Sequence, residues 1–233
     1  MQEAINNSIY FGLTITIIAY LLALKIKDKF KLTILNPILV SFIIVAIVLK
    51  IFSIDYDAYN GSAKYISFLL TPATVCLAIP LYQQIESLKK NTKAILVGIA
   101  TGVVTSLVSV MGLSLLVNLD RIIFISIIPK SITTAIAFGI TEELGGITSI
   151  TMLALLVTGI TGNIIAEFVC KLFRIKNPIA IGLAIGTSSH AIGTTRALEI
   201  GEVEGAMSSL SIAIAGLMTV ALAPILVSIL RVI

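Results

Sequence analysis

Charge is scarce in this 233-residue chain, and tryptophan is absent from it. Only 12% of the residues are charged, whereas 58% are hydrophobic, and the mean hydropathy is +1.09. So little charge cannot cover the surface of a soluble domain of this length. Several apolar stretches of about twenty residues are long enough to cross the roughly 30 Å hydrocarbon core of a bilayer. The composition therefore excludes a soluble protein and predicts an all-α, polytopic membrane protein, with residues 1–233 forming a single transmembrane domain.

The residues needed for several kinds of chemistry are also missing. The chain has one histidine and two cysteines, Cys76 and Cys170, which lie within apolar runs and are typical of small buried hydrophobes. It has no Walker motif, no serine elbow and no Cys/His/Glu cluster with metal-ligand spacing. The net charge of +4 comes without a basic face, so nucleic acid is excluded as a partner. We expect no enzyme activity, no metal, and no cofactor beyond a coupling ion, H+ or Na+.

Eight apolar runs recur along the chain, separated by short connections. The connections at 25–31, 85–93 and 171–177 are basic. Those at 53–62 and 199–204 are acidic. Because basic loops stay in the cytoplasm, this pattern predicts a multi-pass protein of the cell (plasma) membrane with its N-terminus outside and its C-terminus cytoplasmic. The eight runs are 8–24, 33–52, 63–84, 94–117, 122–141, 147–170, 178–199 and 205–230.

The run at 122–141 departs from this pattern, because the neighbouring charges place both of its ends outside. Its middle holds Pro129 and Lys130, followed by three hydroxyl residues. Proline interrupts a helix, and a lysine in the middle of a span is costly in lipid. Both facts predict a re-entrant hairpin with PKSITT at its tip, giving about seven transmembrane helices plus this segment. The alternative is that the run spans the membrane and that the following EELGG loop is cytoplasmic.

If residues 122–141 are re-entrant, the remaining runs form two halves of opposite orientation. We expect inverted repeats at 35–117 and 122–231, each with an interrupted helix in its middle, at 63–84 and 178–199. Interrupted hydrophobic segments at matching positions of inverted repeats point to the substrate site of a secondary transporter. Broken helices are tolerated in a membrane only where the freed backbone groups face protein or a water-filled cavity. The pattern therefore favours a transporter-like protein.

The first interruption and the hairpin tip supply the first group of candidate binding residues. The first interruption centres on TPAT (71–74), which could equally be a simple proline kink with local water. Lys130 is a candidate anion-attracting charge at the tip, and the alternative is an interface lysine on a spanning helix. The candidate substrate-binding residues in these two places are Thr71, Pro72, Thr74, Lys130, Ser131 and Thr133.

The second interruption, GTSSHAIGTTRA at 186–197, contains the chain's only histidine and five hydroxyl residues. Arg196 offers a planar, permanently charged fork suited to a carboxylate, although it could instead reach the interface near Glu199. His190 is a candidate for proton coupling, because its titration range brackets physiological pH, or else a neutral histidine satisfied by a hydroxyl. The candidate substrate-binding residues here are Ser188, Ser189, His190, Thr194, Thr195 and Arg196.

Most of the chain from residue 35 onward resembles the LrgB/CidB family of membrane proteins. Two positions depart from the family pattern, since Thr71 stands where the family usually has glycine and Ala135 where it usually has proline. The matching pieces are LNPIL (35–39), FLLTPATVCLAIPLYQQ (68–84), IPKSITTAIA (128–137), ITEELGGI (140–147) and IGTSSHAIGTTRALEIGEVEGAMSSL (185–210).

The resemblance implies two functions. One is an antiholin-like regulator of murein hydrolase activity and cell lysis, acting with a holin-like LrgA/CidA partner. The other is transport, because the plant plastidal relatives look like glycolate/glycerate translocators and bacterial members are associated with pyruvate. From the interrupted helices and their polar residues we expect a secondary transporter of small monocarboxylates such as pyruvate, glycolate or glycerate. Analogy with inverted-repeat transporters implies a homodimer.

Overall fold

The computed structural model describes residues 10–30, 35–69, 72, 75, 76, 79, 82 and 85–229, which form α-helices and no strand. The chain divides into two compact units, Met1–Cys76 and Leu77–Ile233. Thr71 and Thr74 lie outside the described residues, while Pro72 lies on helical backbone and is exposed. The expectation of an all-helical fold is therefore confirmed, and the break predicted at 63–84 stays a prediction.

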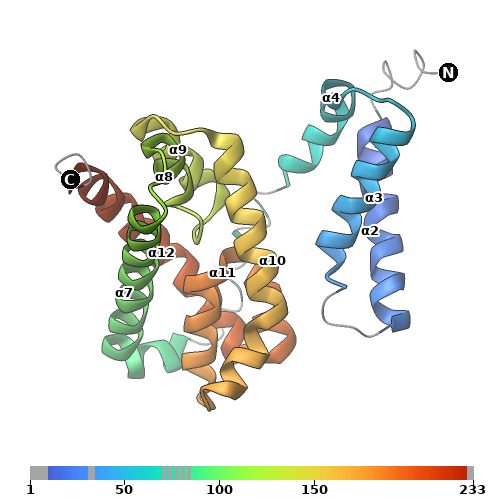
Figure 1. Ribbon diagram of the computed structural model, residues 1–233. Coiled ribbons are helices and arrows are strands. Elements are labelled where there is room, and N and C mark those ends of the chain that lie inside the picture. Colours follow the sequence, from blue (N-terminus) through green and yellow to red (C-terminus); the bar gives the residue numbers. More distant parts are fainter. Residues whose placement is uncertain are drawn as a thin grey trace. The chain divides into compact units, whose positions relative to one another are not determined.

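The first unit contains three helices, α2 (Phe11–Phe30), α3 (Pro37–Ile51) and α4 (Tyr56–Ser67) (Figure 1). The start of α3 is set by Asn36, whose side-chain oxygen accepts hydrogen bonds from the backbone N–H groups of Ile38 at 2.8 Å and Leu39 at 3.4 Å. Pro37 follows at the first helical position, where its missing N–H costs nothing. The backbone N–H of Gly12 donates to Ser62 Oγ at 2.6 Å, which holds α2 against α4.

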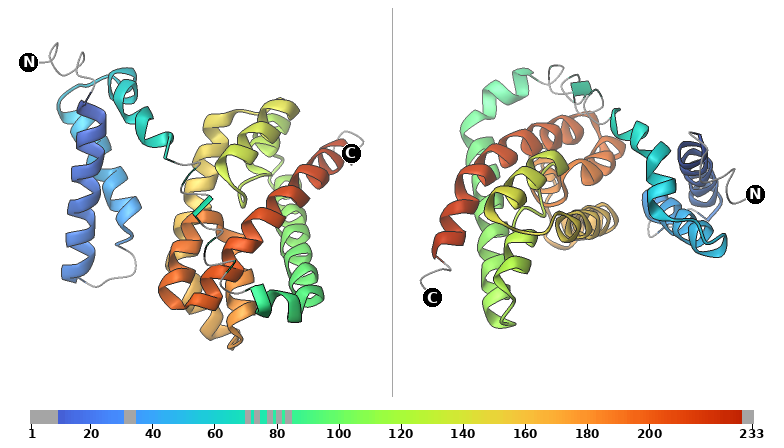
Figure 2. Two further views of the ribbon diagram at one scale, coloured as in Figure 1. Left: turned by 180° about the vertical axis from the view of Figure 1, so that it is seen from behind. Right: turned by 90° about the horizontal axis from the view of Figure 1, so that it is seen from above.

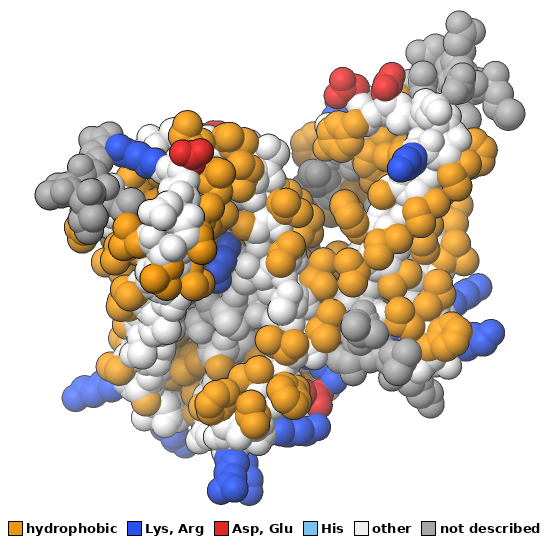
Figure 3. All heavy atoms as spheres, in the orientation of Figure 1, with side chains coloured by type: hydrophobic (Ala, Val, Ile, Leu, Met, Phe, Trp, Pro, Cys, Tyr) orange, Lys and Arg blue, Asp and Glu red, His pale blue; other side chains and the backbone are white. Residues whose placement is uncertain are grey.

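The second unit contains α7 (Ile85–Leu116), α8 (Arg121–Ile127), α9 (Thr134–Leu144), α10 (Thr148–Leu172), α11 (Pro178–Ile200) and α12 (Glu202–Ile229). Within the described residues, three helices are long and apolar enough to cross a membrane: Lys89–Leu116, Thr148–Leu172 and Glu202–Ile229. Each of these helices exposes large apolar side chains, for example Val97, Leu153 and Leu217. Orange atoms cover much of the face shown in Figure 3. The chain is therefore a helical membrane protein, and the count of seven spans stays a prediction.

The main apolar cluster of the second unit contains buried side chains from all six of its described helices. Ile99 of α7, Phe124 of α8, Leu155 of α10 and Met207 of α12 are almost completely inaccessible to solvent. Burial of a side chain of this size stabilises a fold by roughly 1.5–3 kcal/mol in water. This cluster fixes the helices that surround the interrupted segments.

Residues 121–144, which we call the first hairpin, leave the end of α7 and return to the start of α10 (Figures 1 and 2). Ser126 Oγ accepts a hydrogen bond from the N–H of Ile147 at 2.8 Å, so the segment between them begins and ends at one place. The helices α8 and α9 have 7 and 11 residues, or about 10 and 16 Å, too short to span a bilayer. Two short helices in place of one span are consistent with the hairpin expected for residues 122–141, whose re-entrant arrangement in a membrane stays a prediction.

Residues 178–200, which we call the second hairpin, also turn back on themselves. His190 interrupts α11 with φ +42° and ψ −145°, the left-handed side of the backbone map. A Cβ atom built on Gly193 would lie 3.1 Å from Ile185 Cγ2. Eight residues of straight helix would separate these two positions by about 12 Å. The half-helix after His190 therefore runs back beside the half-helix before it.

This reversal corrects the prediction that residues 178–199 cross the membrane. Contacts with α10 show both directions: Gly162 packs against Ser189 before the turn, and Arg196 pairs with Glu167 after it. Both ends of the second hairpin thus lie at the end of α10 that carries Lys171. Connections 171–177 and 199–204, which charge alone assigned to opposite sides, share one side. The hydropathy of 23 residues is the same for a span and a hairpin, so composition could not separate them.

Candidate functional site

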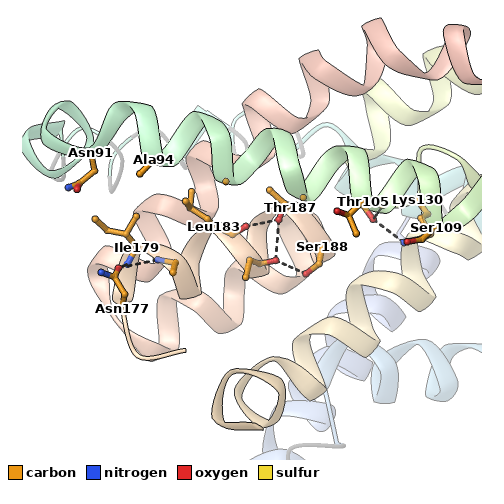
Figure 4. Close-up of a pocket in the computed structure, with 16 residues that line it drawn as sticks. Asn91, Ala94, Thr105, Ser109, Lys130, Asn177, Ile179, Leu183, Thr187 and Ser188 are labelled. Atoms are coloured by element: carbon orange, nitrogen blue, oxygen red, sulfur yellow. Dashed lines mark hydrogen bonds between the residues drawn. The ribbon is translucent and has the colours of Figure 1, made fainter. Parts of the chain in front are cut away.

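A cavity of about 820 Å³ lies between α7 and the first half of α11 (Figure 4). It begins near Asn91 and Asn177, and its other end is formed by Ser109 of α7 and Lys130 of the first hairpin. The hydroxyl and charged groups that line it are gathered at this second end. They are Thr105, Ser106, Ser109, Lys130, Ser131, Thr187 and Ser188.

Lys130 and Ser131 form the tip of the first hairpin. Lys130 is partly buried, and its ammonium donates a hydrogen bond to Ser131 Oγ at 3.1 Å. Ser131 is buried, and its hydroxyl lies 3.2 Å from the hydroxyl of Ser106 on α7. These bonds connect the tip to α7 and hold the ammonium at the cavity wall. Within the described part of the chain, no carboxylate forms a salt bridge with Lys130.

The tip of the second hairpin supplies hydroxyls to the same region. Ser188 Oγ donates to the carbonyl of Ala184 at 2.7 Å and lies 3.0 Å from Ser189 Oγ. Thr187 Oγ1 donates to the carbonyl of Leu183 at 2.7 Å. A hydroxyl that donates to its own helix keeps lone pairs free to accept from a ligand. Ser188 is exposed to the cavity, whereas Thr187 and Ser189 are buried.

A second cavity of about 460 Å³ lies on the other face of the same half-helix, against α10. Lys130, Ala184 and Ser188 line both cavities. Ser189 and Thr158 line the second one only. The first half of α11 therefore lies between two hollows, and the two hairpin tips meet where the hollows come together.

His190 occupies the turn of the second hairpin and is buried, with 3% of its surface exposed. Its Nε2 lies 2.9 Å from the carbonyl oxygen of Leu155 on α10. A carbonyl only accepts, so this geometry requires the proton on Nε2. Space for the ring comes from Gly159, where a Cβ atom would lie 2.8 Å from the imidazole Cε1. His190 is thus held by a carbonyl, and not by the hydroxyl that one interpretation of the sequence expected.

Arg196 lies on the returning half of the second hairpin and lines neither cavity. Its guanidinium pairs with Glu167 of α10 and with Glu199 one helical turn further on. The alternative position that the sequence allowed, beside Glu199, is the one that the structure adopts. Its role as a ligand-binding residue stays a prediction.

Three other predicted site residues lie away from both cavities. Thr194 Oγ1 donates to the carbonyl of His190 at 3.0 Å and meets Ser208 Oγ of α12 at 2.7 Å. Thr195 Oγ1 accepts from the amide of Asn163 at 3.1 Å. Thr133 occupies the N-cap position of α9, without a side-chain capping bond. Thr194 and Thr195 therefore fix the second hairpin to α12 and α10.

Several residues of this region were missed from the sequence. Thr105, Ser106 and Ser109 follow helical spacing on one face of α7, and this polar stripe in an apolar run was a usable signal. Asn163 donates to the carbonyl of Ile192 at 2.9 Å, and Glu167 binds Arg196. Their roles depend on the reversal at His190, which no local pattern announced. Among the described residues there is no group of three His, Cys, Asp or Glu side chains that could hold a metal.

Long apolar helices and two hairpins that meet beside a cavity define a helical membrane protein. Residues 16–229 match the LrgB-like family. The chain is 38% identical over 216 residues to proteins named antiholin-like protein LrgB from Bacillus mycoides (strain KBAB4) and Bacillus cereus (strain B4264), covering 92% of this chain and 94% of each relative. The chain therefore belongs to the LrgB-like family, as its motifs indicated. No solved structure matches it.

Proposed function

We propose that the chain is an antiholin-like protein of the cell membrane that acts with a holin-like partner of the LrgA/CidA type. The observation that carries this proposal is the 38% identity to proteins named antiholin-like, over almost the whole length of both chains. Such coverage leaves little room for a different overall architecture. The proposal concerns regulation of murein hydrolase activity and lysis, and it includes no catalytic step by this chain.

The test is complementation of a bacterial strain that lacks its own copy of the gene. Detergent-induced lysis would be followed by turbidity, with the chain expressed alone or together with the holin-like partner. We expect the chain to slow lysis, and to do so more strongly with the partner present. An unchanged lysis rate in both strains, with the protein verified in the membrane fraction, would refute the antiholin-like proposal.

A second candidate function is secondary transport of small monocarboxylates such as pyruvate, glycolate and glycerate. One observation favours it: two hairpins approach from opposite ends of α10, and their tips meet beside a cavity that contains an ammonium and several hydroxyls. Discontinuous helices that meet near the midplane are how secondary transporters form substrate sites. A protein that only assembled with a partner would have no need for a cavity with an ammonium and several hydroxyls gathered at one end.

In this transport proposal the tip residues Lys130, Ser131, Ser188 and Ser189 contact the substrate. The helices α9 and the second half of α11 both begin at a tip, so their N-terminal N–H groups and positive dipole ends add to the attraction for an anion. Movement of one hairpin relative to α7 or α10 would expose the site alternately to the two sides. His190 is the candidate for proton coupling, with Na+ as the other coupling ion.

Transport is tested by uptake of labelled pyruvate, glycolate and glycerate into proteoliposomes that contain the purified chain. Saturable uptake above that of protein-free liposomes is the expected result. A folded chain that takes up none of the three acids, alone or with the holin-like partner, would rule transport out. Uptake and lysis are measured separately, so either proposal can fail while the other stands.

A further inference from the structure

The second unit has two candidate residues for recognising the negative charge of a ligand, Lys130 and Arg196. Sequence alone favours Arg196, because a guanidinium suits a carboxylate better than an ammonium does. The contacts of the two residues reverse this preference. They differ in the carboxylates around them and in the cavities that they line.

Arg196 already has its carboxylates. Glu167 and Glu199 each accept from one of its terminal nitrogens, so both arms of the fork are occupied. Two acids around one arginine leave this cluster with no excess positive charge. A carboxylate ligand would have to displace a protein carboxylate that is tethered beside the guanidinium, and tethered groups compete at high effective concentration.

Among the residues that the structure describes, no carboxylate pairs with Lys130. Its ammonium donates a hydrogen bond to the neutral hydroxyl of Ser131, and an ammonium has further donor positions for a ligand. Among the lining residues that the structure describes, Lys130 is also the single charged side chain in each of the two cavities beside the first half of α11. An ammonium in a mostly apolar hollow is stabilised by a counter-charge, which a bound anion would supply.

We propose that Lys130 is the residue that recognises the negative charge of the ligand, and that Arg196 is not. This proposal rests on the transport function proposed above and assigns the residue that binds the charged group of the transported acid. The described part of the site holds one cation and no carboxylate. A ligand with one negative charge therefore neutralises the site, whereas a dianion leaves a net negative charge within it. Ser106 and Ser188 line the same cavity as the ammonium, and their hydroxyls suit a hydroxyl or keto oxygen beside the carboxylate.

Lys130 lines both cavities, so the proposal also concerns how the ligand reaches the ammonium. A ligand held by this ammonium is reachable from the α7 face and from the α10 face of the same half-helix. Ser188 shares this double exposure, so one ammonium and one hydroxyl remain in contact with the ligand whichever cavity it occupies. The site therefore holds one ligand at a time.

The experiment measures binding to the full-length chain in detergent by titration calorimetry. The probes are lactate, its neutral isostere lactamide, and the dianion malonate. Native protein is compared with Lys130→Gln, with Lys130→Arg, which keeps the charge, and with Arg121→Gln. The last is a matched control, because Arg121 lies exposed on the same hairpin and lines neither cavity. Thermal unfolding of each variant verifies that it is folded.

We expect native protein and Arg121→Gln to bind lactate more tightly than lactamide or malonate. Lys130→Gln should weaken lactate binding by roughly 10- to 100-fold, as expected for a lost charge-assisted hydrogen bond, and abolish the preference over lactamide. Lys130→Arg should retain the preference. Equal binding of lactate and lactamide by native protein, no binding of lactate, or an unchanged lactate affinity in folded Lys130→Gln would each overturn the assignment.

The outcome is separable from that of the transport proposal. Lactate binding that depends on Lys130, with no uptake of any acid into liposomes, would leave the assignment intact and remove transport. Uptake that survives Lys130→Gln but is lost in Arg196→Gln would remove the assignment and leave transport. Tighter binding of malonate than of lactate would overturn the single-charge selectivity.

Discussion

The guanidinium of Arg196 on α11 pairs with the carboxylate of Glu167 on α10, and this ion pair joins the returning half of the second hairpin to a long apolar helix. The two side chains are 23% and 38% exposed, so the pair lies between a surface salt bridge and a buried one. Surface pairs contribute at most about 1 kcal/mol, whereas breaking a buried pair costs about 3–5 kcal/mol.

We therefore expect Arg196→Gln and Glu167→Gln each to destabilise the chain by about 1–2 kcal/mol, between those limits. The double variant should lose less than the sum of the two. Thermal unfolding in detergent gives both values. Lys171→Gln is the control, because Lys171 also pairs with Glu167 but its side chain is 79% exposed. Strictly additive losses would show that the pair contributes nothing to holding the hairpin.

Gly159 makes room for the ring of His190, and the second prediction concerns this fit. A Cβ atom at residue 159 would lie 2.8 Å from the imidazole Cε1 and 2.9 Å from Ile192 Cβ. Gly159→Ala should therefore cost about 1–3 kcal/mol, as overpacking does. A change of 1 kcal/mol moves the melting temperature by about 2–4 °C in a chain of this size.

The matched control for this substitution is Gly112→Ala on α7, where a Cβ atom would meet nothing within 4 Å. Because glycine weakens a helix interior, this variant should be more stable than native by roughly 0.5–1 kcal/mol. If both variants melt at the same temperature, the close packing of His190 against α10 is not a feature of the protein in detergent.

Local sequence signals located the breaks at Pro129-Lys130 and around His190, but they did not reveal how each one turns the chain. The proline and lysine at 129 and 130 predicted a break inside an apolar run, and the structure has two short helices there. At 178–199 the same kind of evidence, small residues around His190, could not distinguish a loosened span from a reversal. The reversal depends on contacts with the neighbouring helices α10 and α12, between residues more than 20 positions apart in the chain, as at Gly162 and Gly186.

The residues of the candidate site likewise divide into those whose position was predictable from the sequence and those whose position was not. Lys130, Ser131 and Ser188 were predicted and line the cavity, because a charge or hydroxyl in an apolar run is conspicuous. Arg196 was equally conspicuous and lies elsewhere, since Glu167, its partner 29 residues earlier, is brought to it by the fold. A charged residue can be recognised from the sequence, whereas its neutralisation by a distant partner cannot.

The third prediction concerns His190 and the coupling of uptake to protons. Glutamine at this position keeps an N–H donor for the carbonyl of Leu155 and loses the ability to titrate near neutral pH. In proteoliposomes, native uptake should rise as the external pH is lowered, while His190→Gln should show uptake that does not respond to pH. Binding of the acid in detergent should be unchanged. The same pH response in both proteins would remove His190 from the coupling mechanism.

The reversal of the second hairpin makes a fourth prediction, about membrane sidedness. Residues 176 and 202 flank the hairpin and are exposed, and both lie at the end of α10 that carries Lys171. Glu143 is exposed near the opposite end of that helix. In a background with Cys76 and Cys170 replaced by serine, Lys176→Cys and Glu202→Cys should react from the same side of the membrane. Glu143→Cys should react from the other.

A membrane-impermeant maleimide distinguishes the sides when it is added to intact cells and, separately, to inverted vesicles. The lysine-rich connection at 171–177 predicts that Lys176→Cys and Glu202→Cys are labelled in vesicles and protected in cells. The acidic character of 199–204 predicts the opposite for Glu202→Cys, so charge and structure disagree at this residue. Labelling of Lys176→Cys and Glu202→Cys from opposite sides would mean that residues 178–200 cross the membrane. The two tips would then no longer enclose one site, and the assignment of Lys130 would lose its structural basis.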